Sequence, residues 1–356
     1  MKLHHLLTRT TQRVTPIPFH DHSNLVFTST IFKVKPATCH ISPYKSHLTT
    51  PFTPSIFHHI LFATMSSGDQ QFPPQKQDRQ PGKEHVMDPI PQYMNPNYKP
   101  ADKLRGKVAL VTGGDSGIGR AICYCFAKEG ATIALTYVKG QEDKDATDTI
   151  KIIKEAKTKD SKDPIAIATD LGYDANCKSV VDEVVGKFGR IDILINNAAE
   201  QYTCKTVEEI DEKWLDRVFR TNIYSHFFLT RHALKHMKEG SSIINTTSVN
   251  AYKGNATLLD YTSTKGAIVA FTRGLALQLA QKNIRVNGVA PGPVWTPLIP
   301  SSFNEEKTSK FGSECPMNRA GQPYEIAPSY VFLASEDSSY FTGQVLHPNG
   351  GMIVNA

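Results

Sequence analysis

The chain has 356 residues, of which 40% are hydrophobic and 21% are charged, enough for one large α/β domain and an appendage. No apolar run approaches the roughly 18 residues of a membrane-spanning helix, so no membrane partner is expected. The formal net charge is +6, but residues 1–68 hold six basic residues and one acidic residue, so the rest of the chain is nearly neutral and a nucleic-acid-binding face is not expected.

The first segment, residues 1–67, is rich in Ser, Thr, His and Pro and nearly free of acidic residues. It cannot bury enough apolar surface to offset its ordering entropy, so we expect a disordered leader. Its composition is similar to that of an organelle transit peptide, and its many hydroxyl residues and two arginines favour a chloroplast over a mitochondrion. The alternative is translation from Met65, which would leave the protein in the cytosol.

A second segment, residues 68–102, is rich in Pro and Gln and is expected to be an extended, polar linker. It could wrap the surface of the body or of a neighbouring subunit.

Residues 103–356 form the body, in which short apolar runs alternate with amphipathic helical stretches. Seven such runs predict a single α/β, doubly wound Rossmann domain with a seven-stranded parallel sheet covered on both faces. The runs are "KVALVTG", "ATIALTYV", "PIAIATDL", "IDILINNAA", "SSIINTTS", "IRVNGVAPG" and "GQVLHPNGG". Gly130 and Gly189 follow helical stretches and are suited to left-handed helix ends.

The segment "VTGGDSGIGRA" lies between the first expected strand and the first expected helix. Its glycines, Gly113, Gly117 and Gly119, let a pyrophosphate approach backbone N–H groups at a helix N-terminus, where a Cβ would block it. The position between a strand and a helix makes a dinucleotide site the preferred interpretation over a glycine-rich turn that binds nothing.

Several motifs in order give the chain its resemblance to a known family. The "TGGDSGIG" spacing, the "NNAA" segment, "RTNIYS" with Asn222, "INTTS" with Ser248 and "YTSTK" with Tyr261 and Lys265 resemble the short-chain dehydrogenase/reductase family over residues 103–356. Further stretches, such as "QPGKEHVM" and "GNATLLDYTSTKGAIVAFTRGLALQLA", look like the plant glucose and ribitol dehydrogenase homologues, a subgroup that includes plastid NADPH-dependent aldehyde reductases.

The resemblance implies a catalytic tetrad of Asn222, Ser248, Tyr261 and Lys265. Tyr261 and Lys265 lie four residues apart on one helical face, so we expect the ammonium to lower the pKa of the phenol, which exchanges a proton with the substrate oxygen. Ser248 is expected to hydrogen-bond the same oxygen, and Asn222 to anchor a water that relays protons from Lys265. Taken singly, Tyr261 could be a packed aromatic residue, Ser248 a turn residue at a strand end, and Asn222 a helix-kink residue.

The resemblance also implies a set of cofactor contacts along the chain. These residues are Gly113, Asp115, Ser116, Gly117, Ile118, Gly119, Tyr137, Lys139, Asp170, Leu171, Asn197, Ala198, Ala199, Tyr261, Lys265, Pro291, Gly292, Val294 and Thr296.

The end of the second strand bears on the choice of cofactor. NAD-preferring members carry an acid there for the ribose diol, whereas this chain has Tyr137. Lys139 could pair with a 2′-phosphate, although Ser116 stands where many NADP-dependent members carry a basic residue. We therefore favour NADP(H) over NAD(H).

Remaining signals are assigned more simply. Residues 294–323 form a long loop expected to act as a lid, with Trp295 and Leu298 as apolar walls of the substrate pocket. The resemblance implies a homo-oligomer, either a dimer or a tetramer, and the small residues Gly266, Ala267 and Ala270 form a face that could pack against a partner subunit. We interpret His226, His232 and His236 as surface residues and expect no metal site. The six scattered cysteines fit a reducing compartment.

The preferred function is transfer of a hydride between NADP(H) and a small-molecule carbonyl or alcohol, most simply the reduction of aldehydes. A sugar or polyol dehydrogenase would use the same residues. A catalytically silent dinucleotide-binding seed or stress protein would keep cofactor binding without turnover.

Overall fold

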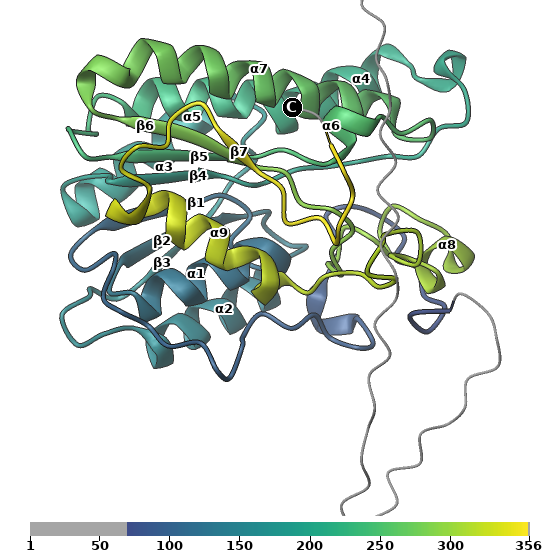
Figure 1. Cartoon of the computed structure of the whole chain (residues 1–356), viewed down its shortest axis with the longest axis horizontal. Coiled ribbons are helices and arrows are strands. Elements are labelled where there is room, and N and C mark those ends of the chain that lie inside the picture. Colours follow the sequence, from purple (N-terminus) through teal and green to yellow (C-terminus); the bar gives the residue numbers. More distant parts are fainter. Residues whose placement is uncertain (1–69, 355–356) are drawn as a thin grey trace, which may run out of the picture. The chain divides into compact units, whose positions relative to one another are not determined.

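The computed structural model describes residues 70–354, which fold around one parallel sheet (Figure 1). The expectations for residues 1–67 lie outside the described residues. The sheet has seven strands in the order β3-β2-β1-β4-β5-β6-β7, and every pair of neighbours is parallel, which confirms the predicted fold class. The strands are β1 (Val108–Val111), β2 (Thr132–Tyr137), β3 (Ile165–Ala168), β4 (Ile193–Asn196), β5 (Ser242–Thr246), β6 (Arg285–Val289) and β7 (Val345–Leu346).

Long helices cover both faces of the sheet. On one side lie α1 (Gly117–Lys128), α2 (Asp143–Ala156) and α9 (Pro323–Ala334) (Figure 1). On the other side lie α3 (Asp174–Phe188), α5 (Ser225–Ala233) and α7 (Leu259–Leu279). In the part of the chain that the structure describes, no helix is long and apolar enough to cross a bilayer.

The two layers have separate cores because side chains alternate along each strand. Val111 and Leu135 pack with the α1 and α9 side, whereas Leu110 and Ala134 pack with the α3, α5 and α7 side. Burial on both faces explains why the strands read as nearly continuous apolar runs in the sequence.

Short elements connect these layers and carry parts of the site. They are η1 (Glu84–Val86), η2 (Val207–Glu209), α4 (Glu212–Phe219), the π-helix η3 (Arg220–Tyr224), α6 (Asn250–Lys253), η4 (Ala280–Lys282), α8 (Glu305–Ser309) and η5 (Glu336–Ser338). The expected left-handed helix ends are confirmed, since Gly130 and Gly189 have φ values of +89° and +85°.

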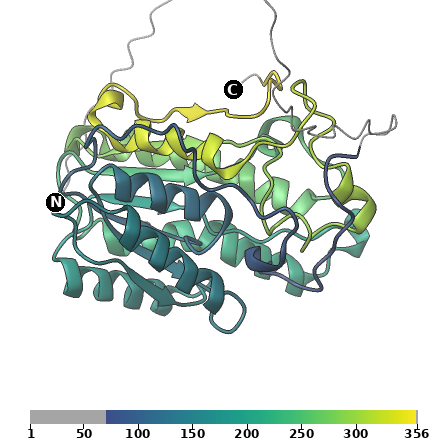
Figure 2. The ribbon, with the colours of Figure 1, turned by 90° about the horizontal axis from the view of Figure 1, so that it is seen from below.

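The segment before β1 packs along the body, and it buries more apolar side chains than its Pro- and Gln-rich composition predicts. It runs past α1 and α2 (Figure 2). Phe72 stacks on Trp295 with ring centroids 3.7 Å apart, and Met87 joins the same buried cluster. Glu84 is also fully buried. The composition of the segment conceals these anchors because they are single residues among exposed Pro, Gln and Lys.

Candidate active site

The glycine-rich turn joins the carboxyl end of β1 to the N-terminus of α1. Gly113 and Gly117 have φ values of +59° and +51°, a conformation that side chains disfavour. A Cβ on Gly119 would lie 1.9 Å from the carbonyl oxygen of Gly113. The turn therefore needs glycine at these positions to present its backbone to a ligand at the helix N-terminus.

Gly119→Ala is expected to distort this turn, because its new methyl group would overlap backbone rather than a flexible side chain. We expect a loss of about 1–3 kcal/mol in the free energy of unfolding, or more, together with weakened nucleotide binding. Gly186→Ala is the matched control. That glycine is exposed on α3 with no atom within 4 Å of an added Cβ, and the change should stabilise the helix by about 0.5–1 kcal/mol. Equal melting temperatures for the two variants in calorimetry would contradict this account of the turn.

The segment after β4 is fastened to the glycine-rich turn. The N–H groups of Asn197 and Ala198 donate to the Thr112 hydroxyl at 2.8 and 3.0 Å, and Asn197 Nδ2 donates to the Thr112 carbonyl at 3.0 Å. The expected "NNAA" contact region and the turn thus form one rigid wall.

A cavity of about 820 Å³ extends from this wall to the N-terminal half of α7. It brings together most of the predicted site residues, namely Gly113, Asp115, Ser116, Gly117, Ile118, Tyr137, Asp170, Leu171, Asn197, Ala198, Ala199, Ser248, Tyr261, Lys265, Pro291, Gly292, Val294 and Thr296. Three predicted residues are not among the lining residues. Gly119 packs behind the turn, Asn222 is buried, and Lys139 is exposed beyond β2.

The reactive end of the cavity is built by β5 and α7. Tyr261 and Lys265 are both buried, and Lys265 Nζ lies 5.2 Å from the centroid of the Tyr261 ring. Lys265 Nζ donates to the carbonyl of Thr246 at 2.9 Å, and the Thr247 hydroxyl donates to the Lys265 carbonyl at 2.7 Å. Ser248 is the second residue after β5, and it lines the cavity and hydrogen-bonds with the phenol of Tyr261.

The expected lowering of the Tyr261 pKa is wrong for this structure. Burial raises the pKa of Tyr261 to about 12, and hydrogen bonding with Ser248 opposes this shift only in part. Burial also lowers the pKa of Lys265 to about 7. The spacing of four residues correctly implied proximity, but it carries no information on how strongly burial disfavours both charged forms.

Asn222 lies in the π-helix η3 between α4 and α5, so its backbone agrees with the alternative interpretation of Asn222 as a helix-kink residue. Its Nδ2 donates to the Glu200 carbonyl at 2.8 Å and to the Thr264 hydroxyl at 3.1 Å. The Glu200 N–H donates back to Asn222 Oδ1 at 2.8 Å. Thr264 precedes Lys265, so Asn222 ties the α7 helix to the segment after β4. Its predicted role in a water relay stays a prediction.

Comparison with known proteins identifies the family. The family model described as "Enoyl-(Acyl carrier protein) reductase" matches residues 113–353. The chain is 74% identical over 291 residues to glucose and ribitol dehydrogenase of Daucus carota, covering 82% of this chain and 100% of that protein. It is 77% identical over 283 residues to chloroplastic NADPH-dependent aldehyde reductase 1 of Arabidopsis thaliana, covering 79% and 98%.

The chain belongs to the short-chain dehydrogenase/reductase family. Solved structures agree with this assignment. A short-chain dehydrogenase/reductase from Serratia marcescens is 34% identical with a TM-score of 0.64, covering 70% of this chain and 98% of its own. A blue fluorescent protein from a metagenomic library, solved in complex with NADPH, is 32% identical with a TM-score of 0.65 and has the same coverage.

Away from Tyr261 and Lys265, charged residues that line the cavity interact with other charged side chains, and the sequence did not predict these interactions. The Asp170 carboxylate pairs with Arg217 at 2.6 Å, and Arg217 also pairs with Glu200. Asp115 is buried close to Glu142, and burial raises the pKa of both carboxyl groups. Arg217, Glu142 and the lysines Lys253, Lys307 and Lys310 line the cavity although no motif marked them.

Two further interpretations are wrong, namely that His226 and His232 lie at the surface and that Trp295 forms a wall of the pocket, whereas His236 is half-exposed. His226 is 1% exposed with a pKa lowered to about 3 by burial, and His232 is buried with Nε2 at 2.9 Å from Asp174 Oδ1. Trp295 does not form a pocket wall, because it stacks on Phe72 and donates from Nε1 to the carbonyl of Pro89 at 2.8 Å. Leu298 does line the cavity. Among the described residues no group of acidic, His and Cys side chains is placed to hold a metal ion.

Proposed function

We propose that the protein reduces aldehydes with NADPH. The observation that carries this proposal is the placement of the Tyr261 phenol, which is buried beside Ser248 and Lys265 at one end of a long cavity whose other end is a glycine-rich turn. Reduction needs a protonated phenol that donates to the carbonyl oxygen, whereas alcohol oxidation needs the phenolate. The similarity to an NADPH-dependent aldehyde reductase supports the same direction.

The cavity fits a dinucleotide. Its glycine-rich turn leaves no room for a Cβ at Gly119, and Pro291, Gly292, Val294 and Thr296 line the cavity after β6. Position 137 at the end of β2 holds a tyrosine where NAD-preferring members carry an acid, which supports NADP(H) over NAD(H). When bound, the nicotinamide supplies the hydride.

The chain's own residues supply binding and proton transfer. Tyr261 donates a proton from its hydroxyl to the carbonyl oxygen of the substrate, and Ser248 donates a hydrogen bond to the same oxygen. Lys265, held by the Thr246 carbonyl, lies close enough to the ring to lower the cost of the phenolate that remains. The bonds of Asn222 keep α7 in place while this occurs.

A substrate panel tests the proposal. The purified protein is offered aliphatic aldehydes with NADPH or NADH, and glucose and ribitol with NADP⁺, and nucleotide absorbance is followed from pH 7 to 9. Aldehyde reduction with a preference for NADPH supports the proposal. Faster oxidation of the two polyhydroxyl compounds at pH 7 would instead support the sugar or polyol dehydrogenase, which the similarity to glucose and ribitol dehydrogenase keeps as the second candidate.

We further propose chloroplast import and a domain plan of leader 1–67, extended Pro- and Gln-rich linker 68–102 and family domain 103–356. The chloroplastic relative and the acid-poor composition support the import signal. Fusion of residues 1–68 to a fluorescent reporter tests it, and a diffuse cytosolic signal would favour translation from Met65.

We propose that the protein is a homo-oligomer, a dimer or tetramer. Phe227 and Leu277 are 54% and 82% exposed, and Gly266 and Ala267 of α7 leave room for a close approach. Sedimentation velocity that finds only monomers at micromolar concentration would contradict this.

A further inference from the structure

Residues 80–85, which we call the strap, belong to the segment that precedes β1, and they run along the cavity. At one end, Gln80 Oε1 accepts from the Gln201 N–H at 3.0 Å, and Gln80 Nε2 donates to the Ser302 hydroxyl at 3.2 Å. Pro81 and Gly82 line the cavity itself. A Cβ on Gly82 would lie 2.3 Å from the Pro297 carbonyl oxygen, so the strap fits closely against the loop after β6.

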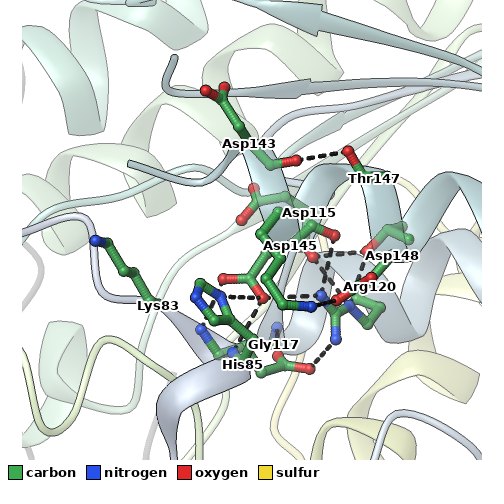
Figure 3. A network of polar contacts seen from close by, with 12 residues as sticks. Lys83, His85, Asp115, Gly117, Arg120, Asp143, Asp145, Thr147 and Asp148 are labelled. Atoms are coloured by element: carbon green, nitrogen blue, oxygen red, sulfur yellow. Dashed lines mark hydrogen bonds and ion pairs between the residues drawn. The ribbon is translucent and has the colours of Figure 1, made fainter. Parts of the chain in front are cut away.

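The other end of the strap is fixed to the glycine-rich turn by Glu84. The Gly117 N–H donates to Glu84 Oε2 at 2.5 Å, and Arg120 Nη1 donates to Glu84 Oε1. The carboxylate of Asp145 accepts from the N–H groups of Glu84 and His85 at 2.8 and 3.0 Å. Figure 3 shows that Gly117, Arg120, Asp145 and His85 converge while Lys83 points away.

Arg120 connects this carboxylate to the rest of the turn. Its Nε donates to the Asp115 carbonyl at 2.9 Å and to the Thr149 hydroxyl at 2.8 Å, so the guanidinium is held in one orientation. Burial raises the pKa of Glu84 to about 7, and Arg120 is the strongest influence in the opposite direction. Glu84 and Arg120 together therefore hold both the Asp115 carbonyl and the Gly117 N–H.

We propose that Glu84 is a positioning residue for cofactor binding: it sets the glycine-rich turn in the shape that receives the dinucleotide phosphates and anchors the strap that slows release of the bound nucleotide. This inference rests on the proposed use of NADPH. Gly117 has no side chain to fix its own peptide, so the direction of its N–H depends on an acceptor brought from 33 residues earlier. The paired Arg120 cation offsets the charge of Glu84, which would otherwise repel phosphate at a helix N-terminus.

The test uses the full chain with Glu84→Ala and Glu84→Gln. NADPH affinity is measured by fluorescence titration, and NADPH dissociation by stopped-flow displacement with excess NADP⁺. We expect Glu84→Ala to release NADPH about tenfold faster or more, as for a lost hydrogen bond to a charged group, with an intermediate effect for Glu84→Gln, which keeps an acceptor.

Asp88→Asn is the matched control, because it removes the same charge from an exposed residue of the same segment and should leave the rate unchanged. The dissociation rate is read only from molecules that hold NADPH, so a lower folded fraction in Glu84→Ala does not imitate the effect. If Glu84→Ala releases NADPH at the same rate as the parent protein, the proposed role of Glu84 and the strap is wrong, but the proposed reductase activity is unaffected. Failure of the parent protein itself to bind NADPH overturns both.

Discussion

Tyr261→Phe is expected to lower kcat for aldehyde reduction by about 10³-fold while NADPH binds nearly as before. The change removes only the hydroxyl that donates a proton, and it keeps the ring that packs beside Lys265 in the buried wall of the cavity. Steady-state kinetics at saturating NADPH, together with fluorescence titration of the nucleotide, separates the two effects.

Tyr252→Phe serves as the control. This change removes the phenol hydroxyl of Tyr252 on the neighbouring helix α6. The ring of Tyr252 contacts His347, and Tyr252 does not line the cavity. Its kcat should match that of the parent protein. Parental turnover by Tyr261→Phe would contradict the proton-donor role, and cofactor binding with no turnover in any variant would favour the silent-scaffold alternative.

Lys265→Met is expected to lower kcat/KM by at least about 10²-fold without weakening the fold. Methionine fills similar space but brings no charge near the developing phenolate and no donor for a ribose hydroxyl. Lys265 also lowers the free energy of unfolding at neutral pH, because burial lowers its pKa from 10.5 to about 7. At pH 7 the free energy of unfolding should be unchanged or raised, since a buried amine that unfolding would charge is replaced by an apolar group.

The sign of the pH dependence follows from the lowered pKa of Lys265. Between pH 7 and 10.5 the unfolded chain holds a proton at Lys265 that the folded chain has lost. The contribution of this residue to stability therefore rises with pH across this window, and it is lost as the pH falls towards 7. Urea denaturation at several pH values should show this rise in the parent protein and in the control Lys282→Met, an exposed site, but a flatter profile in Lys265→Met. Parallel profiles for all three proteins would show that Lys265 is not the buried group that titrates.

The sequence was sufficient wherever a pattern repeats or a local motif has one conformation. The seven apolar runs predicted the parallel strands, because burial on both faces leaves continuous Val, Ile and Leu. The spacing of Gly113, Gly117 and Gly119 predicted the turn because only glycine fits its close approaches and positive φ values.

The remainder depends on contacts between distant segments, which leave no periodic signal. Neither the burial of Trp295 under Phe72 nor the bond from Gly117 to Glu84 follows from the residues around either partner. The same holds for His226, whose helical run gave no sign that a neighbouring helix would cover it. The predicted lowering of the Tyr261 pKa is wrong for this reason as well, because desolvation is a property of the whole packed site.

The docking of Phe72 onto Trp295 limits how much of the N-terminus can be trimmed. The Gln71 and Phe72 N–H groups donate to the Ser309 carbonyl at 2.6 and 3.0 Å, and Pro89 accepts the indole N–H. If the proposed leader is removed on import, a cut upstream of Gln71 keeps these contacts, whereas a later cut would uncover the indole and remove one anchor of the segment that leads into the strap. N-terminal sequencing of protein isolated from tissue would therefore find the mature end within the acid-poor leader or just after it.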